Sequence, residues 1–349
     1  MDEERLMREA ISLAVPTRPH PNPRVGALVL DAAGTVVSRA AHAGPGQPHA
    51  EAAALGAAGE RARGGTLVVT LEPCDHTGRT PPCTAAILAA GVARVLVGAV
   101  DPDSRVSGRG LARLEAAGLE VRAGIAAAEA AALDAGYFHH RRTGRPRVTL
   151  KAALTLDGQS AAADGTSRWI TSPEARADAH RLRAQSDAVM VGAGTLAADD
   201  PALTVRLPEY DGPQPRPVVV AGRRPLPPQA RLWQRHPLVL APQPLDVPGE
   251  VVVAPGPEGV DLQAGLEALG ERGLLDLLVE GGPILAGALW RAGLVDRGVF
   301  YFAARLGGGA GLPALAGRFA TLAAARDIEI VSAGRVGPDL RVEFTVKEP

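Results

Sequence analysis

The stretch 70–83 reads TLEPCDHTGRTPPC, and the stretch 42–51 reads HAGPGQPHAE. The first contains both cysteines of the 349-residue chain, Cys74 and Cys83, and the second contains His49. One imidazole and two thiolates are three typical zinc ligands, and a site with three protein ligands leaves a fourth position open for water. The sequence therefore predicts a zinc site of the catalytic kind, with His49, Cys74 and Cys83 as the ligands.

The local pattern places these residues at the ends of secondary-structure elements. The β-branched run at 66–71 predicts a buried strand that ends just before Cys74. Pro48 suits the first turn of a helix that opens at His49. Cys83 precedes another expected helix, whose N-terminal dipole favours an anionic thiolate.

Glu51 stands two residues after His49 and is the candidate catalytic residue. Zinc lowers the pKa of a bound water to about 7, and a neighbouring carboxylate can take that proton and return it to a leaving amine. Zinc deaminases are described with this H-x-E and P-C layout and with a glutamate that is not a ligand. The alternative is a structural zinc site, closed by His42 or His76 as a fourth ligand.

Apolar periodicity predicts alternating helices and strands on both sides of a linker, which indicates an α/β protein with sheets covered on both faces. In the first half we expect helices at 3–14, 49–61, 84–90 and 110–117, and strands at 25–30, 66–71, 95–100 and 119–122. The run TGRPR at 143–147 is the predicted linker. In the second half we expect helices at 173–185, 262–272 and 284–292, and strands at 148–154, 188–192, 218–221, 238–241, 251–254, 275–280, 299–303 and 342–346. The pieces 205–217 and 222–236 are rich in Pro and Arg and are expected to be surface loops.

Composition excludes several classes of protein. Lys and Arg number 37 against 38 Asp and Glu, and aromatic residues are 3%, so a nucleic-acid partner is not expected. No apolar stretch reaches the roughly 18–20 residues of a membrane span, and the N-terminal sequence lacks the pattern of a signal peptide. We therefore expect a cytoplasmic protein without membrane contact. A homo-oligomer is a separate expectation, which the composition does not decide.

The first half resembles a known enzyme family in four stretches. These are PNPRVGALV (21–29), the two stretches quoted above, with eight residues between the cysteines, and 101–121. They resemble the deaminase half of the bifunctional deaminase/reductases of riboflavin biosynthesis. The resemblance implies a cytidine-deaminase-like, three-layer α/β/α domain at 1–145, with zinc on His49, Cys74 and Cys83. It also implies acid/base catalysis by Glu51, and Asn22 as a residue that holds the pyrimidine.

The second half resembles the reductase half of the same family, which is similar in fold to dihydrofolate reductase. The matching stretches are 148–206 and VEGGPILA at 279–286, whereas 207–270 match poorly. The resemblance implies an NADPH-dependent reductase domain at 146–349, and a role for Lys151 near the sugar is a further hypothesis. The implied NADPH contacts are Ala153, Trp169, Thr195, Asp199 and Gly282; the implied substrate contacts are Ser167, Arg183, Leu203, Arg206 and Glu280.

The predicted function is thus a two-step conversion of a phosphorylated small molecule. The first half would hydrolyse an amino group from a diaminopyrimidinone that carries a ribosylamino 5'-phosphate. The second half would reduce the ribosyl chain to the ribityl form with NADPH. Two alternatives remain: a nucleic-acid base deaminase, and a zinc-stabilised, nucleotide-binding sensor without catalysis.

Overall fold

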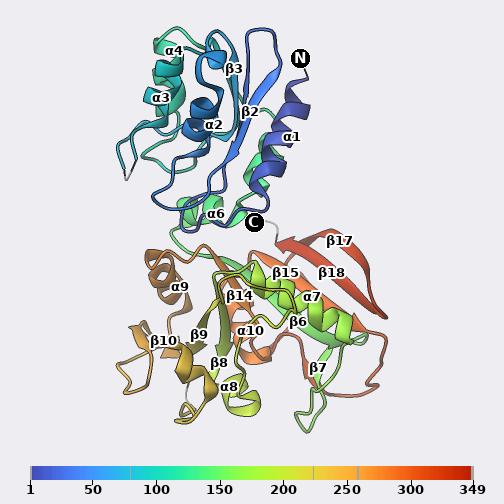
Figure 1. Cartoon of the computed structure of the whole chain (residues 1–349). Helices are drawn as coiled ribbons and strands as arrows, with labels where there is room; N and C mark the ends of the chain where they lie inside the picture. Colours follow the sequence, from blue (N-terminus) through green and yellow to red (C-terminus); the bar gives the residue numbers. More distant parts are fainter. Residues whose placement is uncertain (1, 79, 223, 258, 347–349) are drawn as a thin grey trace. The chain divides into compact units, whose positions relative to one another are not determined.

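The computed structural model describes residues 2–78, 80–222, 224–257 and 259–346. The chain separates into two compact units, 1–143 and 144–349 (Figure 1). Among the described residues, no helix is long and apolar enough to cross a membrane.

The first unit is built on a five-stranded sheet with the order β2-β1-β3-β4-β5. The strand β1 is antiparallel to both of its neighbours, whereas β3, β4 and β5 run parallel. Because β3 and β4 are buried along their length, they read as continuous apolar runs. The strands are β1 (Gly26–Leu30), β2 (Val36–Ala41), β3 (Thr66–Leu71), β4 (Arg94–Ala99) and β5 (Glu120–Ala123).

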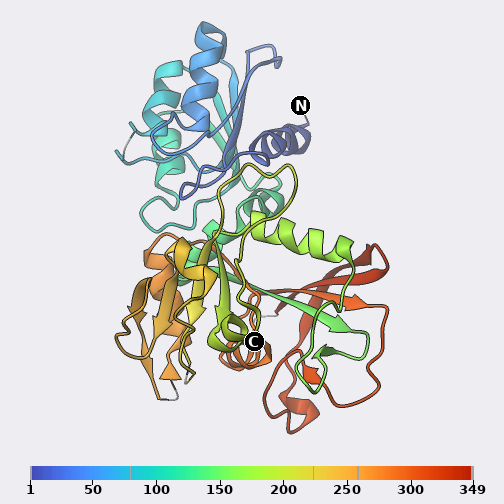
Figure 2. The ribbon, with the colours of Figure 1, turned by 60° about the horizontal axis from the view of Figure 1, so that its bottom comes forward.

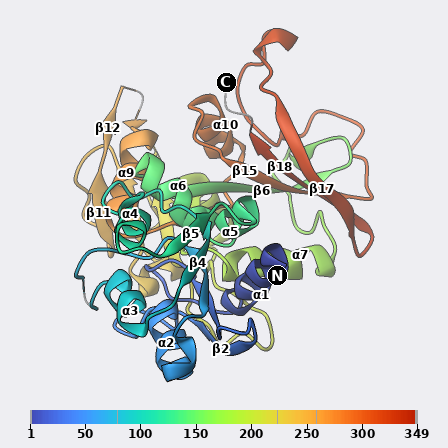
Figure 3. The ribbon, with the colours of Figure 1, turned by 90° about the horizontal axis from the view of Figure 1, so that it is seen from above.

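Helices cover both faces of this sheet, and the predicted three layers are confirmed. Figures 1 and 3 show α1 and α5 on one face and α2, α3 and α4 on the other. The side chains of Leu6 and Met7 on α1 are buried against β1 and β3, and Gly26 allows the close approach because a Cβ there would meet the backbone of Ala10. The helices are α1 (Glu3–Ala14), α2 (Ala50–Ala58), α3 (Cys83–Ala90), α4 (Arg109–Ala116), α5 (Ala127–Ala132) and α6 (Ala135–Thr143), with the 3-10 turn η1 (Gly59–Ala62) after α2.

The second unit contains a nine-stranded sheet with the order β11-β10-β9-β8-β14-β6-β15-β18-β17. Its strands from β11 to β15 are parallel to their neighbours, and β18 and β17 are antiparallel. Figure 2 shows β17 and β18 as the red hairpin at one end of the sheet. The strands are β6 (Arg147–Thr155), β8 (Ala188–Gly192), β9 (Arg216–Val220), β10 (Leu238–Ala241), β11 (Glu250–Val253), β14 (Asp276–Val279), β15 (Arg297–Ala303), β17 (Ile328–Val336) and β18 (Asp339–Val346). Short pairings join β12 (Pro255–Gly256) with β13 (Gly259–Val260) and β7 (Gln159–Ala161) with β16 (Leu312–Pro313).

Two apolar cores lie on the two faces of this sheet. One core packs α9 (Leu262–Glu271) and α10 (Pro283–Arg291) against the strands. The other packs α7 (Pro173–Ala184), α8 (Ala193–Asp199) and the turn η2 (Arg231–Arg235) against the opposite face. Ser172 caps the start of α7 by accepting the N–H of Ala175. A further 3-10 turn, η3, spans Leu322–Ala324.

The predicted alternation is confirmed, but the structure adds elements that were not predicted, among them α5, α6, α8, β2 and β17. The strands β2 and β17 were not predicted, because their exposed or mixed residues lack a clear period. The prediction that 222–236 is a surface loop is wrong for η2, where Leu232 and Trp233 are buried and the Trp233 indole donates to the Pro227 carbonyl. The two units separate between residues 143 and 144, at the start of the predicted linker 143–147. Within that run Arg145 is buried and forms a double hydrogen bond with Asp296 of the same unit.

Candidate active site

The predicted zinc ligands lie at two helix starts and one strand end. His49 is the N-cap residue of α2 and has extended backbone angles (φ −65°, ψ 159°). Cys83 is the first residue of α3, after Pro82 at the N-cap position. Cys74 follows just after the end of β3. Helix N-termini favour negative charge, so Cys83 occupies a position that suits a thiolate.

The three ligand atoms lie close enough to share one ion. Nδ1 of His49 is 3.2 Å from Sγ of Cys83 and 3.7 Å from Sγ of Cys74, and all three atoms lie within 4.8 Å of one another. Tetrahedral zinc, with bonds of about 2.3 Å to sulfur and 2.0 Å to nitrogen, spaces its ligands roughly 3.5–3.8 Å apart. The donor set and its spacing therefore fit zinc. Nε2 of the same imidazole lies 3.3 Å from Oγ1 of Thr80, as an outer partner that orients a ligating histidine does.

The two thiols set each other's protonation. A hydrogen bond with Cys83 lowers the pKa of the Cys74 thiol, and His49 lowers it further against the effect of burial. The same thiol pair and burial raise the pKa of Cys83. Cys74 is thus readily anionic without metal, whereas Cys83 would lose its proton only when an ion binds, because a ligating cysteine must be a thiolate. In the described part of the chain this group has three members, and neither His42 nor His76, the alternatives for a fourth ligand, belongs to it.

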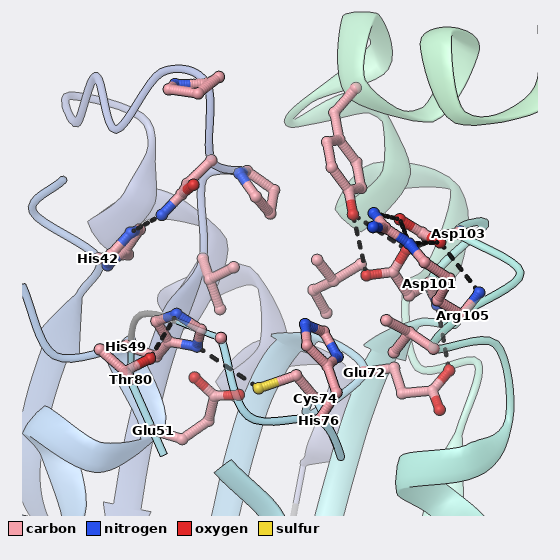
Figure 4. A pocket seen from close by; sticks show the side chains of 18 of the residues that line it. His42, His49, Glu51, Glu72, Cys74, His76, Thr80, Asp101, Asp103 and Arg105 are labelled. Atoms are coloured by element: carbon pink, nitrogen blue, oxygen red, sulfur yellow. Dashed lines mark hydrogen bonds and ion pairs between the residues drawn. The ribbon is translucent and has the colours of Figure 1, made fainter. Parts of the chain in front are cut away.

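Glu51 lies in the first turn of α2, and its side chain is buried, with 3% exposed. Burial raises the pKa of its carboxyl above the ordinary value. Figure 4 shows this carboxylate beside Cys74 and His49, on the wall of a cavity of about 340 Å³. A volume of this size suits a small organic molecule.

Asn22 lines the same cavity. A chain of hydrogen bonds fixes the orientation of its side-chain amide. Nδ1 of His42 lies 3.1 Å from the carbonyl of Pro48, which can only accept, so Nδ1 carries the proton. Burial lowers the pKa of His42, so the ring is neutral. Its Nε2 is therefore an acceptor for Nδ2 of Asn22 at 3.0 Å, and the amide oxygen of Asn22 is left to accept other hydrogen bonds.

A buried carboxylate behind the cavity was missed by the sequence analysis. Glu72 is 3% exposed and accepts the backbone N–H groups of Asp101, Gly108 and Gly110 at 3.2, 3.0 and 3.1 Å. The last two belong to the start of α4. The helix start comes close to the chain after β3, because a Cβ on Gly110 would overlap the carbonyl of Pro73. Glu72 therefore holds the loop 101–110 against the strand that leads to Cys74.

This loop forms the cavity wall opposite the zinc ligands (Figure 4). The hydroxyl of Tyr137 donates to both carboxylate oxygens of Asp101 at 3.1 Å. Arg105 forms a 2.6 Å ion pair with Asp103 and lowers the pKa of that carboxyl to about 2. This wall thus presents both negatively charged and positively charged side chains to a polar ligand. Neither the predicted elements nor the resemblance in 101–121 assigned a role to Asp101, Asp103 or Arg105.

In the second unit, predicted residues meet where neighbouring parallel strands end. The strands β8, β14 and β6 are adjacent, and ligands of open α/β sheets bind at the carboxyl ends of such strands. Thr195 follows β8 on α8, and its hydroxyl accepts the N–H of Gly282, the N-cap residue of α10, at 3.0 Å. The two predicted cofactor residues are thus in direct contact.

Arg183 and Glu280 form a buried, bidentate ion pair. The guanidinium Nε and Nη2 lie 2.6 and 2.9 Å from the two carboxylate oxygens, and each side chain is 12% exposed. Burial would raise the pKa of Glu280, but the charge of Arg183 and its hydrogen bonds hold it at about 2. Burial lowers the pKa of the nearby Lys151 ammonium, although Glu280 acts in the opposite direction. Arg183 and Glu280, both predicted substrate contacts, therefore use much of their hydrogen-bonding capacity in pairing with each other.

The remaining predicted residues are less closely connected. Asp199, at the end of α8, pairs with Arg168 at 2.8 Å. Trp169 is 60% exposed, and the guanidinium of Arg176 lies 4.5 Å from its ring centre. In the described residues, no side-chain hydrogen bond joins Ser167, Trp169 or Ala153 to the other predicted positions. Leu203 is buried and Arg206 is exposed, on a segment that contacts Arg183 through the Thr204 carbonyl.

Comparison with known proteins decides the family. Residues 1–99 match the cytidine and deoxycytidylate deaminase zinc-binding region, and residues 146–341 match the RibD C-terminal domain. The curated riboflavin biosynthesis protein RibD of Escherichia coli is 41% identical over 97% of this chain and 98% of its own length. The chain belongs to the RibD family.

Solved RibD structures have the same fold over the whole chain. Acinetobacter baumannii RibD is 34% identical, with a TM-score of 0.90 over 99% of both chains. A Thermotoga maritima protein described as a diaminohydroxyphosphoribosylaminopyrimidine deaminase/5-amino-6-(5-phosphoribosylamino)uracil reductase is 32% identical, with a TM-score of 0.87 over 99% of both chains. The RibD assignment confirms a cytidine-deaminase-like domain followed by a dihydrofolate-reductase-like domain. The chain is a bifunctional riboflavin-pathway enzyme that uses zinc and NADPH.

Proposed function

We propose that the deaminase domain, residues 1–145, acts first and that the reductase domain, residues 146–349, acts on its product. The substrate would be the diaminopyrimidinone ribosylamino 5'-phosphate, and the product its ribityl counterpart. The observation that carries the proposal is the group of His49, Cys74 and Cys83 around one position, with the buried Glu51 beside it in a cavity.

His49, Cys74 and Cys83 would hold the zinc ion, and Thr80 would orient the imidazole. Zinc, when bound, acidifies water to a pKa of about 7, so that a nucleophile exists at neutral pH. The carboxylate of Glu51 would accept the proton of the attacking water and deliver it to the departing amine as ammonia forms. Its burial supports this role, because a raised carboxyl pKa lies nearer to the working pH.

Asn22 would hold the pyrimidine through its amide oxygen. The neutral His42 supports this role, because its Nε2 accepts one N–H of the Asn22 amide and so leaves the amide oxygen available. Replacing His42 would then act through the orientation of Asn22.

In the reductase domain, NADPH would lie across the carboxyl ends of β8, β14 and β6. The proposed NADPH contacts are Ala153, Trp169, Thr195, Asp199 and Gly282, and the proposed substrate contacts are Ser167, Arg183, Leu203, Arg206 and Glu280. The contact between Thr195 and Gly282 supports the first set. The pairing of Arg183 with Glu280 makes the exposed Arg206 the freer guanidinium for the substrate phosphate.

The test is the Glu51→Gln variant, with Glu60→Gln as control because Glu60 is an exposed glutamate of the same unit. We expect Glu51→Gln to lower kcat for ammonia release by about 10²–10⁴-fold, with zinc content unchanged. Reduction of pre-deaminated substrate by NADPH should be as fast as in the parent protein. Unchanged ammonia release by Glu51→Gln would refute the proposed role.

We also propose a cytoplasmic homo-oligomer. Support comes from β17, which has a partner on one side only in the nine-stranded sheet and exposes the apolar side chains of Ile330 and Val331. Such an edge is a template for pairing with a second chain. Sedimentation measurements that gave a monomer at micromolar concentration would contradict this proposal.

A further inference from the structure

The segment 202–206, which carries Arg206, belongs to no helix or strand. Its alternate residues Leu203 and Val205 are buried at 1% and 6% exposure, whereas Arg206 is exposed. Leu203 also has a φ of +51°, which is uncommon for a leucine. A segment with buried side chains and no strand partner needs another source of hydrogen bonds for its backbone.

Side chains supply those hydrogen bonds. Nη1 of Arg235 donates to the carbonyls of Ala202 and Leu203 at 2.9 and 3.3 Å. Nη1 of Arg183 donates to the carbonyl of Thr204 at 2.8 Å. The guanidinium groups of Arg183 and Arg235 thus hold the backbone of the first half of the segment.

The second half, which leads directly into the Arg206 side chain, is held by two neutral residues. Gln214 accepts the N–H of Val205 through Oε1 at 2.7 Å and donates through Nε2 to the same residue's carbonyl at 3.4 Å, as a strand partner would. His180, on α7, accepts the N–H of Arg206 through Nδ1 at 3.2 Å. These two side chains fix the backbone at Val205 and Arg206.

The charges around the segment favour an anion at Arg206. Arg183 is already paired with Glu280, while Arg206 has no ion pair in the described parts of the chain. Burial and the nearby Arg183 charge lower the pKa of both Arg206 and Arg235. Neutral side chains suit the positions of His180 and Gln214. A charged side chain there would change the electrostatic potential that the substrate phosphate meets at Arg206.

We propose that His180 and Gln214 are positioning residues of the reductase, which hold the backbone of 205–206 so that the Arg206 guanidinium meets the substrate phosphate. The inference rests on the proposed role of Arg206. Neither residue touches substrate in this arrangement, so both act through Arg206. The segment that includes Gln214 also lies in the part of the chain to which the sequence analysis assigned no role.

The test uses the full-length chain, pre-deaminated substrate and NADPH. His180→Leu removes the acceptor, whereas His180→Asn retains an acceptor near the position of Nδ1. We expect His180→Leu to raise KM for the phosphorylated substrate about tenfold, with little change in kcat, because small displacements of binding groups have effects of this size or larger. His180→Asn should restore much of the loss.

Gln214 allows a matched pair of variants. Gln214→Leu removes both hydrogen bonds, whereas Gln214→Glu retains an acceptor for the shorter one, so the first should raise KM and the second should raise it less. Gln263→Leu is the control, because Gln263 is an exposed glutamine on α9 away from this segment. Ammonia release and KM for NADPH should stay at parent values in all five variants.

The decisive measurement is a double-mutant cycle with Arg206→Ala. If His180 and Gln214 act through Arg206, adding His180→Leu or Gln214→Leu to Arg206→Ala leaves KM where Arg206→Ala alone put it. Multiplicative effects would overturn the inference. If Arg206→Ala raises KM but His180→Leu and Gln214→Leu do not, the inference about His180 and Gln214 is overturned and the role of Arg206 stands. If Arg206→Ala leaves KM unchanged, the proposed role of Arg206 is overturned as well.

Discussion

Replacing Glu280 by glutamine would leave the guanidinium of Arg183 buried without its counter-charge. The pKa of Glu280 is about 2 in the folded protein, against an ordinary value of 4.5. At roughly 1.4 kcal/mol for each pH unit, this depression corresponds to a stabilisation on the order of 3 kcal/mol. Removing one partner of a buried pair generally costs about 3–5 kcal/mol. We therefore expect Glu280→Gln to lower the free energy of unfolding of the second unit by about 3 kcal/mol at pH 7.

The assay is urea unfolding followed by tryptophan fluorescence. All three tryptophans, Trp169, Trp233 and Trp290, lie in the second unit, so the signal reports on that unit alone. The folded-state pKa of Glu280 is depressed, so its stabilisation is complete above about pH 4.5 and is lost as the pH falls towards 2. The difference between parent and variant should be nearly constant from pH 7 to 5 and about 1 kcal/mol smaller at pH 3.5.

Glu250→Gln is the matched control. Glu250 also faces two arginines, Arg216 and Arg272, but it is 45% exposed. Exposed pairs contribute about 0–1 kcal/mol, so this variant should unfold almost like the parent. If Glu280→Gln cost no more than Glu250→Gln, the argument from burial would be refuted.

Three further predictions concern the two sites. Glu72→Gln should lower the stability of the first unit by about 1–3 kcal/mol and raise KM for deamination, because one or two of its three N–H partners lose their acceptor. Circular dichroism measures the stability and ammonia release measures KM. An unchanged KM would contradict the role given to the loop 101–110. Gly110→Ala should be destabilising by about 1–3 kcal/mol in thermal unfolding, because its Cβ meets the Pro73 carbonyl; parent-like stability would show that this contact relaxes freely. Asp199→Ala should raise KM for NADPH and leave ammonia release intact, and loss of both activities would indicate misfolding instead.

Local sequence was sufficient to predict the group of His49, Cys74 and Cys83. The signals lie within a few residues of the proposed ligands: a proline before each of the two helices, a β-branched strand before Cys74 and a helix after Cys83. The structure brings the three side chains together. Most of the reductase residues came from resemblance; the residue types themselves marked only Arg183, Arg206 and the Gly281-Gly282 turn as candidates. Their backbone positions follow from the strand order, but their individual contacts depend on tertiary structure.

Contacts between distant residues could not be predicted. Glu72 binds N–H groups that lie 29, 36 and 38 positions further along the chain, so nothing near it marks its role. Arg183 and Glu280 are 97 positions apart, and the sequence offered no reason to pair them. Gln214 lies in a stretch without motif or periodicity, where only the fold reveals that it serves the backbone of Val205.

The two cysteines of the chain both belong to the three-residue group around His49. With the proposed ligand set, every thiol of this protein is therefore coordinated when the ion is in place. A colourimetric thiol titration of the native protein then counts metal-free molecules directly, with no background from other sulfhydryls. Oxidative inactivation during purification would likewise be confined to the deaminase, so reducing agents that do not chelate should preserve one activity without altering the other.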